Sequence, residues 1–306
     1  MYKLSVASTF YNSEDTIIDF IKSILTTIKK LNISEYEIIL VNDGSTDKSF
    51  DKINENYKNE NIKIINLSKN FGHHKATMTA YKYCSGDFIF FIDSDLEVNP
   101  SSLEPLWNNL GDSDLIYGKI KKKYDGFLRE FQTKFFYKIL NTFSDVKYNS
   151  ENLNVILFKK KCIDSVLQYK EKNIITFSLY NLIGFKSKSI YIEKKTKKTS
   201  SYTFFKKVDL GLEFLISTTI RPIKILFYIS LINILVFVAF SFKILFSYFV
   251  LNMQPGYTSL VLLQLYFYSL ITFLISFLLL YVSKIYLETK RRPTAIIDKV
   301  IDLKKN

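Results

Sequence analysis

Two aspartates stand two positions apart, directly after an apolar run. Residues 88–92 read Phe-Ile-Phe-Phe-Ile, and Asp93, Ser94 and Asp95 follow them. Carboxylates at positions i and i+2 after a strand can share one divalent cation, and Mg²⁺ is usually held by one or two carboxylates together with substrate phosphates. Most D-x-D sequences are solvated turns, but the position after a strand favours a metal site. The pattern therefore predicts that Asp93 and Asp95 hold Mg²⁺ or Mn²⁺ against a diphosphate.

A second acidic loop lies at residues 41–47, which read VNDGSTD. Thr46 or Asp47 can cap the helix that follows, and Gly44 permits a tight turn. Asp43 stands at the tip of the preceding strand, where its carboxylate could accept hydrogen bonds from a nucleobase or a ribose. Taken alone, the loop favours the simpler role for Asp43, which is to shape the turn.

Short apolar runs alternate with helical patterns through residues 3–118. The predicted strands are Leu4–Thr9, Glu37–Asn42, Ile62–Asn66, Phe88–Ile92 and Leu115–Tyr117, and the predicted helices lie near 14–30, 47–57, 73–83 and 101–110. This alternation is typical of βαβ units and a mostly parallel sheet. Ligands of such sheets bind beyond the carboxyl ends of the strands. We therefore expect the loops at 42–45, 68–72 and 93–95 to converge on one site.

The rest of the chain follows other patterns. Residues 126–143 form an amphipathic aromatic and basic stretch, typical of a helix in the membrane interface or of an ordinary core helix, and Tyr202–Ser217 is a second candidate. Two apolar stretches, Ile225–Met253 and Thr258–Ser283, are long enough to cross a membrane. The predicted parts are a sheet core at 1–125, an acceptor-side segment at 126–222, a transmembrane hairpin at 223–285 and a basic cytosolic tail at 286–306.

The basic charge of the chain agrees with a membrane location. The formal net charge of +13 divides into +7 on residues 1–223 and +6 on residues 224–306. With two apolar spans present, an anionic lipid leaflet accounts for this charge better than nucleic acid does, and we expect no nucleic-acid partner. Basic residues flank the two spans, which predicts cytosolic ends by the positive-inside rule. The N-terminal apolar run is too short for a signal peptide. We therefore expect a multi-pass protein of the cell membrane with a cytosolic sheet domain.

The combination of these motifs resembles a known family. Ser5–Asn12, VNDGSTD, LSKNFGHHKA at 67–76 and FIDSDLEVNP at 91–100 occur in the order and spacing of the family 2 glycosyltransferases, which have the GT-A fold. The run at 116–141, the paired spans and KIYLETKRRP at 284–293 are similar to the polyprenyl-phosphate sugar transferases. That group includes the bactoprenol-phosphate glucosyltransferases and, more distantly, the dolichol-phosphate mannose synthases.

The resemblance implies a reaction and its partners. A sugar would pass with inversion from a nucleotide sugar, by default a UDP-sugar, to a polyprenyl phosphate such as undecaprenyl (bactoprenyl) phosphate. The transfer would take place at the cytosolic face of the membrane and would feed cell-surface glycan modification. Membrane lipid is an implied partner, and a homo-oligomer is compatible with the family.

The resemblance also assigns roles to single residues. Asp43 matches the nucleotide-binding aspartate, and Asp93 and Asp95 match the metal-binding pair, with Asp95 as the direct ligand. The other positions that match nucleotide-binding loops are Thr9, Tyr11, Lys69, Asn70, Gly72 and Ser94. Ser13 stands where the family commonly has glutamate. Either Glu14 substitutes for that glutamate or the contact is absent.

A phosphate acceptor determines what the site must supply. The second pKa of a phosphate monoester is about 6, so the attacking oxygen is already anionic at pH 7 and a strong general base is not essential. The reaction then needs a metal for the departing diphosphate and cations beside the acceptor phosphate. The candidate cations are Lys119, Lys121, Lys123 and Arg129, with Lys121 and Arg129 assigned as catalytic. The alternative is that this basic run is a solvated face.

The resemblance weakens after residue 148. Asn154 aligns with the aspartate, and Ile156 with the arginine, of a Gly-Asp-Phe-Arg-like segment in the family. The usual candidate base is therefore missing unless Glu151 serves, and Ile120 replaces a second arginine. Two further hypotheses follow from these departures. One is a membrane-anchored transferase that glycosylates a saccharide hydroxyl, and the other is a catalytically silent membrane scaffold.

Two further features limit the interpretation. His73 and His74 are adjacent, whereas metal-binding histidines on a helix usually stand at i and i+4. We therefore expect them to be residues at the start of a helix near the nucleotide loop. Trp107 is the one tryptophan, and the sequence contains no Gln-x-x-Arg-Trp. That absence argues against a processive polysaccharide synthase.

Overall fold

The computed structural model describes residues 3–120, 151–169, 176–194, 256–290 and 293–304, with isolated helical positions at 134–142 and 228–250. The chain forms two compact units. One comprises Met1–Tyr137, Val146–Thr203 and Arg292–Asn306, and the other comprises Lys138–Asp145 and Phe204–Arg291. Several predictions fall outside the described residues: Lys121, Lys123, Arg129, most of the helix at 126–143, the helix at 202–217 and most of the span at 225–253.

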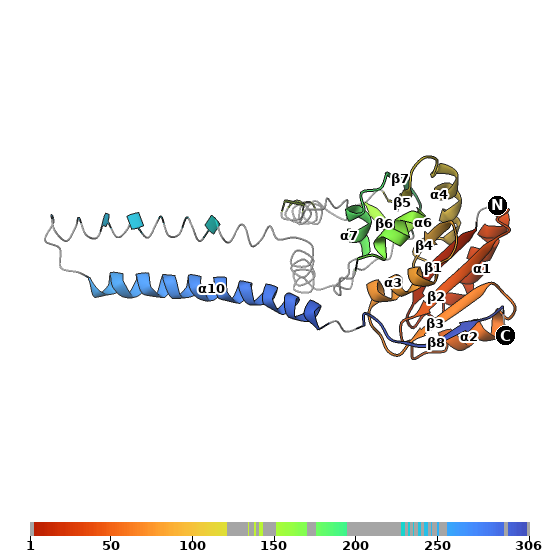
Figure 1. Cartoon of the computed structure of the whole chain (residues 1–306), viewed down its shortest axis with the longest axis horizontal. Coiled ribbons are helices and arrows are strands. Elements are labelled where there is room, and N and C mark those ends of the chain that lie inside the picture. The colour runs from red at the N-terminus through yellow and green to blue at the C-terminus, as the bar shows by residue number, and fades with distance from the viewer. Residues whose placement is uncertain are drawn as a thin grey trace. The chain divides into compact units, whose positions relative to one another are not determined.

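An eight-stranded sheet is the framework of the first unit (Figure 1). Its strands, in spatial order, are β7 (Ser187–Tyr191), β5 (Leu115–Lys119), β6 (Asn152–Lys159), β4 (Phe88–Phe91), β1 (Leu4–Phe10), β2 (Tyr36–Asn42), β3 (Ile62–Leu67) and β8 (Ile297–Asp302). Strands β1 to β4 are parallel and β5 is parallel to β7, whereas β6 and β8 run antiparallel to their neighbours. The predicted α/β class with a mostly parallel sheet is confirmed.

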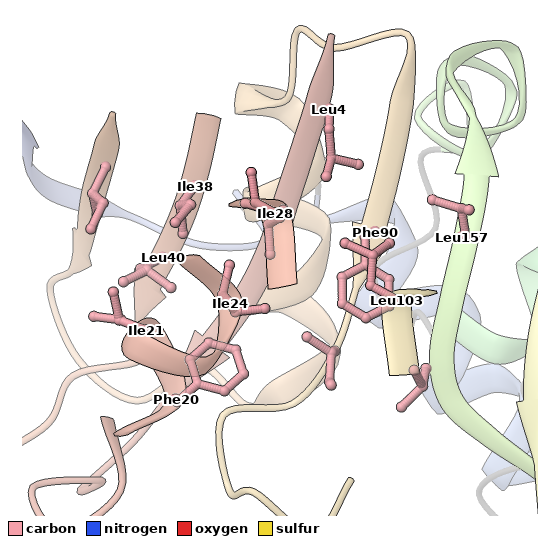
Figure 2. Close-up of a cluster of buried hydrophobic side chains, with 14 of the residues drawn as sticks. Leu4, Phe20, Ile21, Ile24, Ile28, Ile38, Leu40, Phe90, Leu103 and Leu157 are labelled. Atoms are coloured by element: carbon pink, nitrogen blue, oxygen red, sulfur yellow. The ribbon is translucent and has the colours of Figure 1, made fainter. Parts of the chain in front are cut away.

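The central strands are buried on both faces, which explains why apolar residues dominate their sequences. Successive side chains of a strand point to opposite faces. Accordingly, Ile38 and Leu40 of β2 join one hydrophobic cluster, and Ile39 and Val41 join the other. Figure 2 shows the first cluster, in which α1 (Ile17–Lys30) turns an apolar stripe toward the sheet through Phe20, Ile21, Ile24 and Ile28.

The other helices of this unit that lie within its described ranges are short. They are α2 (Ser49–Asn56), α3 (His73–Tyr83), the 3₁₀ turn η1 (Pro100–Ser102), α4 (Leu103–Asn109), α6 (Lys160–Val166) and α7 (Thr176–Leu182). The first four elements lie where the sequence predicted helices. Helix α1 begins at Ile17 rather than near residue 14, because residues 11–16 form a loop that is bonded to the loop after β2.

Strand β8 was not anticipated from the sequence. It lies within residues 286–306, for which the sequence predicts a basic tail, and it pairs antiparallel with β3. Leu303, directly after β8, is only 2% exposed and belongs to the first hydrophobic cluster. The end of the chain is therefore part of the sheet unit.

The second unit contains the long helix α10 (Tyr257–Thr289). Among the described residues, α10 is the one helix long and apolar enough to cross a membrane. Its most apolar window, Tyr266–Ser283, has a mean hydropathy of 1.9 and no buried residue. This helix covers the second predicted span. Residues 225–253 are described only at isolated helical positions, so the paired hairpin stays a prediction.

Candidate active site

Asp93 lies just beyond the carboxyl end of β4, where the sequence predicted a metal ligand. Its Oδ1 atom is 3.5 Å from Nε2 of His73, and the Nδ2 atom of Asn154 lies 3.4 and 3.5 Å from its two carboxylate oxygens. Burial raises the pKa of Asp93, and repulsion from Asp95 adds to this shift, whereas His73 and Asn154 oppose it. A positively charged ligand at this carboxylate would relieve both effects.

A chain of hydrogen bonds runs through His73 from β6 to β1. The Nδ2 atom of Asn154 is 3.0 Å from Nε2 of His73, and Nδ1 of His73 is 3.2 Å from Oγ1 of Thr9. The amide nitrogen of Asn154 donates, whereas each ring nitrogen of His73 donates or accepts according to the tautomer. The histidine thus connects β1 with the carboxylate after β4. The sequence predicted His73 only as a residue at the start of a helix, and it does begin α3.

The other two residues of the D-x-D loop differ in their exposure to solvent. Ser94 is buried, and its hydroxyl donates to the carbonyl oxygen of Thr9 at 2.9 Å. Asp95 is exposed, and its Oδ1 accepts the backbone N–H of Glu97 at 3.0 Å. One side chain therefore ties the loop to β1 while the other stays open to solvent. The role of Asp95 as the direct metal ligand stays a prediction.

Asp43 is almost fully buried, and it joins two loops. Its two carboxylate oxygens accept the backbone N–H groups of Phe71 at 2.8 Å and of Gly72 at 3.0 Å. Burial raises the pKa of Asp43, and these two hydrogen bonds act against that rise. Gly44 is packed so closely that a Cβ atom there would lie 2.4 Å from the carbonyl carbon of Lys69. The predicted loops after β2 and β3 therefore converge.

The loops after β1 and β2 are bonded to each other as well. Asn12 donates its N–H to Oγ of Ser45 at 3.0 Å and accepts the N–H of Thr46 at 2.9 Å. Glu14 forms an ion pair with Lys52 at 3.0 Å, and a hydrogen bond from Lys52 lowers the pKa of this carboxyl. Glu14 thus connects the loop after β1 to α2. Its predicted contact with a nucleotide stays a prediction.

The other predicted donor-binding residues lie on these same loops. Tyr11 is 48% exposed. The Lys69 ammonium group lies 5.3 Å from the centroid of the Phe71 ring, and Asn70 is exposed. Gly72 adopts φ +95°, a backbone conformation that favours glycine. All three predicted loops therefore meet at the carboxyl edge of the sheet, where a donor could contact them together.

Two lysines lie at this same edge of the sheet. Lys119 ends β5, and its ammonium group is 4.3 Å from the centroid of the Tyr191 ring. Lys194 follows β7 and forms an ion pair with Glu97 of the D-x-D loop at 2.7 Å. Lys119 was predicted from the sequence, whereas Lys194 was not. No local motif signals Lys194, because its partner is distant in the sequence.

Asn154 and Ile156 lie in different environments, although both are on β6. Asn154 reaches Asp93 and His73, as described above, whereas Ile156 is fully buried in the second hydrophobic cluster. His74 also faces the protein interior, where it contacts Thr176 at 3.0 Å, and burial lowers its pKa to about 4. The adjacent histidines therefore do not share a ligand site. Within the described residues, no group of three His, Cys, Asp or Glu side chains could hold a metal.

Comparison with known proteins identifies the family. The chain matches Glycosyl transferase family 2 over residues 5–165. A Mycobacterium tuberculosis (strain CDC 1551 / Oshkosh) protein named as a glycosyltransferase is 31% identical over 97% of this chain and 88% of its own length. The uncharacterized glycosyltransferase sll0501 of Synechocystis sp. (strain ATCC 27184 / PCC 6803 / Kazusa) is 25% identical over 96% of this chain and 94% of its own length.

A solved structure shows a more distant likeness. Glucosyl-3-phosphoglycerate synthase from Mycobacterium tuberculosis, in complex with uridine-diphosphate, aligns with a TM-score of 0.47 and 17% identity, covering 72% of this chain and 80% of that chain. The family match itself contains Asp43, the D-x-D pair and Asn154. The convergent loops therefore lie inside the matched region. The chain is a glycosyltransferase that belongs to glycosyl transferase family 2.

Proposed function

We propose that this enzyme transfers a sugar, with inversion, from a UDP-sugar to a polyprenyl phosphate at the cytosolic face of the cell membrane. The observation that carries the proposal is the meeting of Asp93, Asp95 and the Asp43-anchored loops at one edge of the sheet. A nucleotide and its diphosphate would lie across these loops. The resemblance to polyprenyl-phosphate transferases supplies the acceptor class.

The carboxylates fit a divalent cation. Asp95 is open to solvent, and Asp93 carries a pKa that burial and its neighbour raise. Two carboxylates and the oxygens of a diphosphate form the ligand set that Mg²⁺ or Mn²⁺ commonly takes. When bound, the cation would neutralise the charge that develops on the departing diphosphate. Asp93 and Asp95 would hold it, and Ser94 fixes their loop to β1.

The acceptor chemistry agrees with an uncharged side chain at position 154. An oxygen of the acceptor phosphate forms the new bond to the anomeric carbon, and the bond from that carbon to the nucleotide diphosphate breaks, leaving its electron pair on the diphosphate. No proton has to be removed, because the phosphate is already ionised at pH 7. Asn154, which cannot act as a base, occupies the position that faces Asp93. A saccharide hydroxyl acceptor would require a base.

Cations beside the acceptor would hold its phosphate. Lys119 and Lys194 lie at the edge of the sheet that carries Asp93. Lys121, Lys123 and Arg129 remain candidates outside the described residues. The positive charge of these groups would place an anionic headgroup near the anomeric carbon and offset its repulsion from the diphosphate.

The membrane attachment would consist of two spans, residues 225–253 and α10. Helix α10 supports this part of the proposal by its length, its mean hydropathy and its exposed apolar side chains. Basic residues at Lys284 and Lys290–Arg292 follow the second span and favour a cytosolic end. A homo-oligomer in the membrane is compatible with this arrangement.

Calorimetric titration with UDP tests the donor half of the proposal. The full-length protein in detergent should bind UDP in the presence of Mg²⁺ or Mn²⁺ and lose most of that affinity when EDTA is added. Asp95→Ala should show the same loss, whereas Asp112→Ala, at an exposed site away from the loops, should bind like the wild type. Equal binding by wild type and Asp95→Ala would contradict a role for the D-x-D pair.

A further inference from the structure

The loop after β3, residues 68–72, is held at both of its ends. At one end, the backbone N–H of Ser68 donates to the carbonyl oxygen of Ile296 at 3.0 Å. At the other end, the N–H groups of Phe71 and Gly72 donate to Asp43. The loop carries Lys69 and Asn70, so its two anchors determine where these side chains lie.

The Ile296 anchor directly precedes the C-terminal strand β8. The residue pairs Lys63–Asp302, Ile65–Val300 and Leu67–Ile297 define the antiparallel register of β3 and β8, which shifts between Asn66 and Leu67. Figure 1 shows β8 along the edge of the sheet beside β3. The irregular register coincides with the end of β3 that leads directly into the loop. The pairing of β8 with β3 therefore stops at Leu67, and the loop at residues 68–72, called the donor loop below, begins at the next residue.

The opposite end of β8 is fixed in the protein core. Leu303 donates its N–H to the carbonyl of Ile62 at 2.9 Å and accepts the N–H of Asn59 at 3.0 Å. Its side chain is 2% exposed. Along the strand, the Lys299 ammonium group lies 4.4 Å from the centroid of the Phe50 ring on α2. By contrast, Val300 of β8 is 43% exposed, so the buried anchor is Leu303, directly after the strand.

We propose that β8 is a positioning element of the donor site, which holds the loop at residues 68–72 in its nucleotide-binding conformation. The inference rests on the proposed function, because it assigns the loop to donor binding. Residues 290–296 alone join α10 to β8.

Three substitutions in the full-length protein test this role. Leu303→Asp places a charge at a buried position and should release the strand. Leu303→Met preserves the buried apolar side chain, and Val300→Asp introduces the same charge within β8 at an exposed position. For each variant we would measure amide hydrogen exchange, the Kd for UDP in the presence of Mg²⁺, and the cooperativity of thermal unfolding.

The proposal expects Leu303→Asp to accelerate exchange of the Ser68 amide and to raise the Kd for UDP at least about tenfold. Leu303→Met and Val300→Asp should stay within about twofold of the wild type. Faster exchange in β8 with an unchanged Ser68 amide and an unchanged Kd would overturn the proposal. If the thermal unfolding of Leu303→Asp is not cooperative, this variant is not properly folded. Leu303→Ala then replaces it, and exchange of the Ser68 amide and the Kd for UDP are measured in the same way.

The exchange measurement separates this inference from the proposed function. A wild-type protein that fails to bind UDP would contradict the proposed donor. In that case, hydrogen exchange of the Ser68 amide in the wild type and in Leu303→Asp would still show whether β8 protects this amide. Protection that is lost with the strand supports the positioning role, and protection that survives its release overturns it.

Discussion

The side-chain amide of Asn154 lies 3.0 Å from Nε2 of His73 and within 3.5 Å of both carboxylate oxygens of Asp93. An uncharged group therefore occupies the position at which the family resemblance predicts an aspartate. This arrangement leaves Asp93 and Asp95 as the charged pair of the D-x-D loop. It also agrees with a reaction in which the acceptor arrives without a proton to be removed.

Asn154→Asp should strengthen divalent cation binding. The new carboxylate would lie close to Asp93, and added ligand charge raises cation affinity. We expect the Mg²⁺ concentration for half-maximal UDP binding to fall by about threefold or more. Calorimetric titration at fixed UDP measures it, with Asn181→Asp on the exposed face of α7 as the control. An unchanged Mg²⁺ requirement would show that position 154 does not influence the cation site.

Gly44→Ala should destabilise the protein and weaken donor binding. Its φ of +71° disfavours alanine, and the added Cβ would meet the Lys69 backbone at 2.4 Å. Gly111→Ala is the matched control, because Gly111 also has a positive φ, +49°, but nothing lies within 4 Å of the point that its methyl group would occupy. Each should lose about 1 kcal/mol of unfolding free energy from backbone strain. Denaturant titration should show a further loss for Gly44→Ala alone, and equal losses would contradict the close packing of the two loops.

Asp43→Asn should release the donor loop from one of its anchors. The asparagine oxygen can replace only one of the two carboxylate acceptors, which leaves an N–H of Phe71 or Gly72 without its partner. An unsatisfied buried donor costs about 1–3 kcal/mol. We expect a loss of that size in unfolding free energy and a higher Kd for UDP. Wild-type stability and affinity in this variant would show that the two hydrogen bonds contribute little.

Glu37 should contribute stability that is lost in acid. Ser5 and Ser85 donate hydrogen bonds of 2.6 Å to this carboxylate. Burial alone raises the pKa of Glu37, but these bonds and the charge of Lys3 outweigh it and hold the pKa below the ordinary value of 4.5. The folded state therefore favours the ionised form, so its contribution is present above pH 4.5 and disappears as the pH falls through the folded-state pKa.

As the pH is lowered from about 5 to about 3, the free energy of unfolding should accordingly decrease less in Glu37→Gln than in the wild type. At about pH 5 the variant should be less stable than the wild type. Chemical denaturation across this pH range measures both slopes. Glu35→Gln, at an exposed position, leaves the Glu37 hydrogen bonds in place and serves as the control. A wild-type slope in Glu37→Gln would exclude this carboxylate as a source of the acid sensitivity.

Lys119→Gln should separate acceptor binding from donor binding. If Lys119 holds the acceptor phosphate, the KM for polyprenyl phosphate should rise about tenfold while the Kd for UDP stays unchanged, because one charge-assisted contact is lost. Lys188→Gln, near the start of exposed β7 and so toward the opposite ends of the strands, should change neither value. Equal effects of the two substitutions would indicate that only the overall charge of the domain matters.

The sequence predicted the central strands because local patterns determine them. Strands β1 to β4 are largely buried, so each appears as a short run rich in apolar residues between polar loops. Strand β8 gives no such signal. Its residues, IDKVID, mix three charged with three apolar side chains without regular alternation at an exposed edge, and its partner β3 lies far earlier in the chain. Pairing over such a separation is a property of the tertiary structure.

The candidate site likewise contains residues that local sequence patterns indicate and residues whose roles depend on contacts between distant segments. Asp43 and the D-x-D pair were recognisable because each directly follows a strand. His73 gave no comparable signal, since its partners Thr9 and Asn154 are 64 and 81 positions away. Lys194 was missed for the same reason, because its ion pair with Glu97 forms only when β7 reaches the sheet. Residues whose roles depend on contacts between distant segments therefore required the folded chain.

The most direct test of the central claim is transfer of radiolabelled sugar from a UDP-sugar into the lipid fraction of membranes that contain the protein and undecaprenyl phosphate. A screen of UDP-sugars identifies the donor, and Asp95→Ala and Asp112→Ala serve as paired variants. The account predicts a lipid-linked product that mild acid releases, formed by the wild type and Asp112→Ala and lost in Asp95→Ala. An equal lipid signal from Asp95→Ala, or a labelled product that resists mild acid, would contradict it.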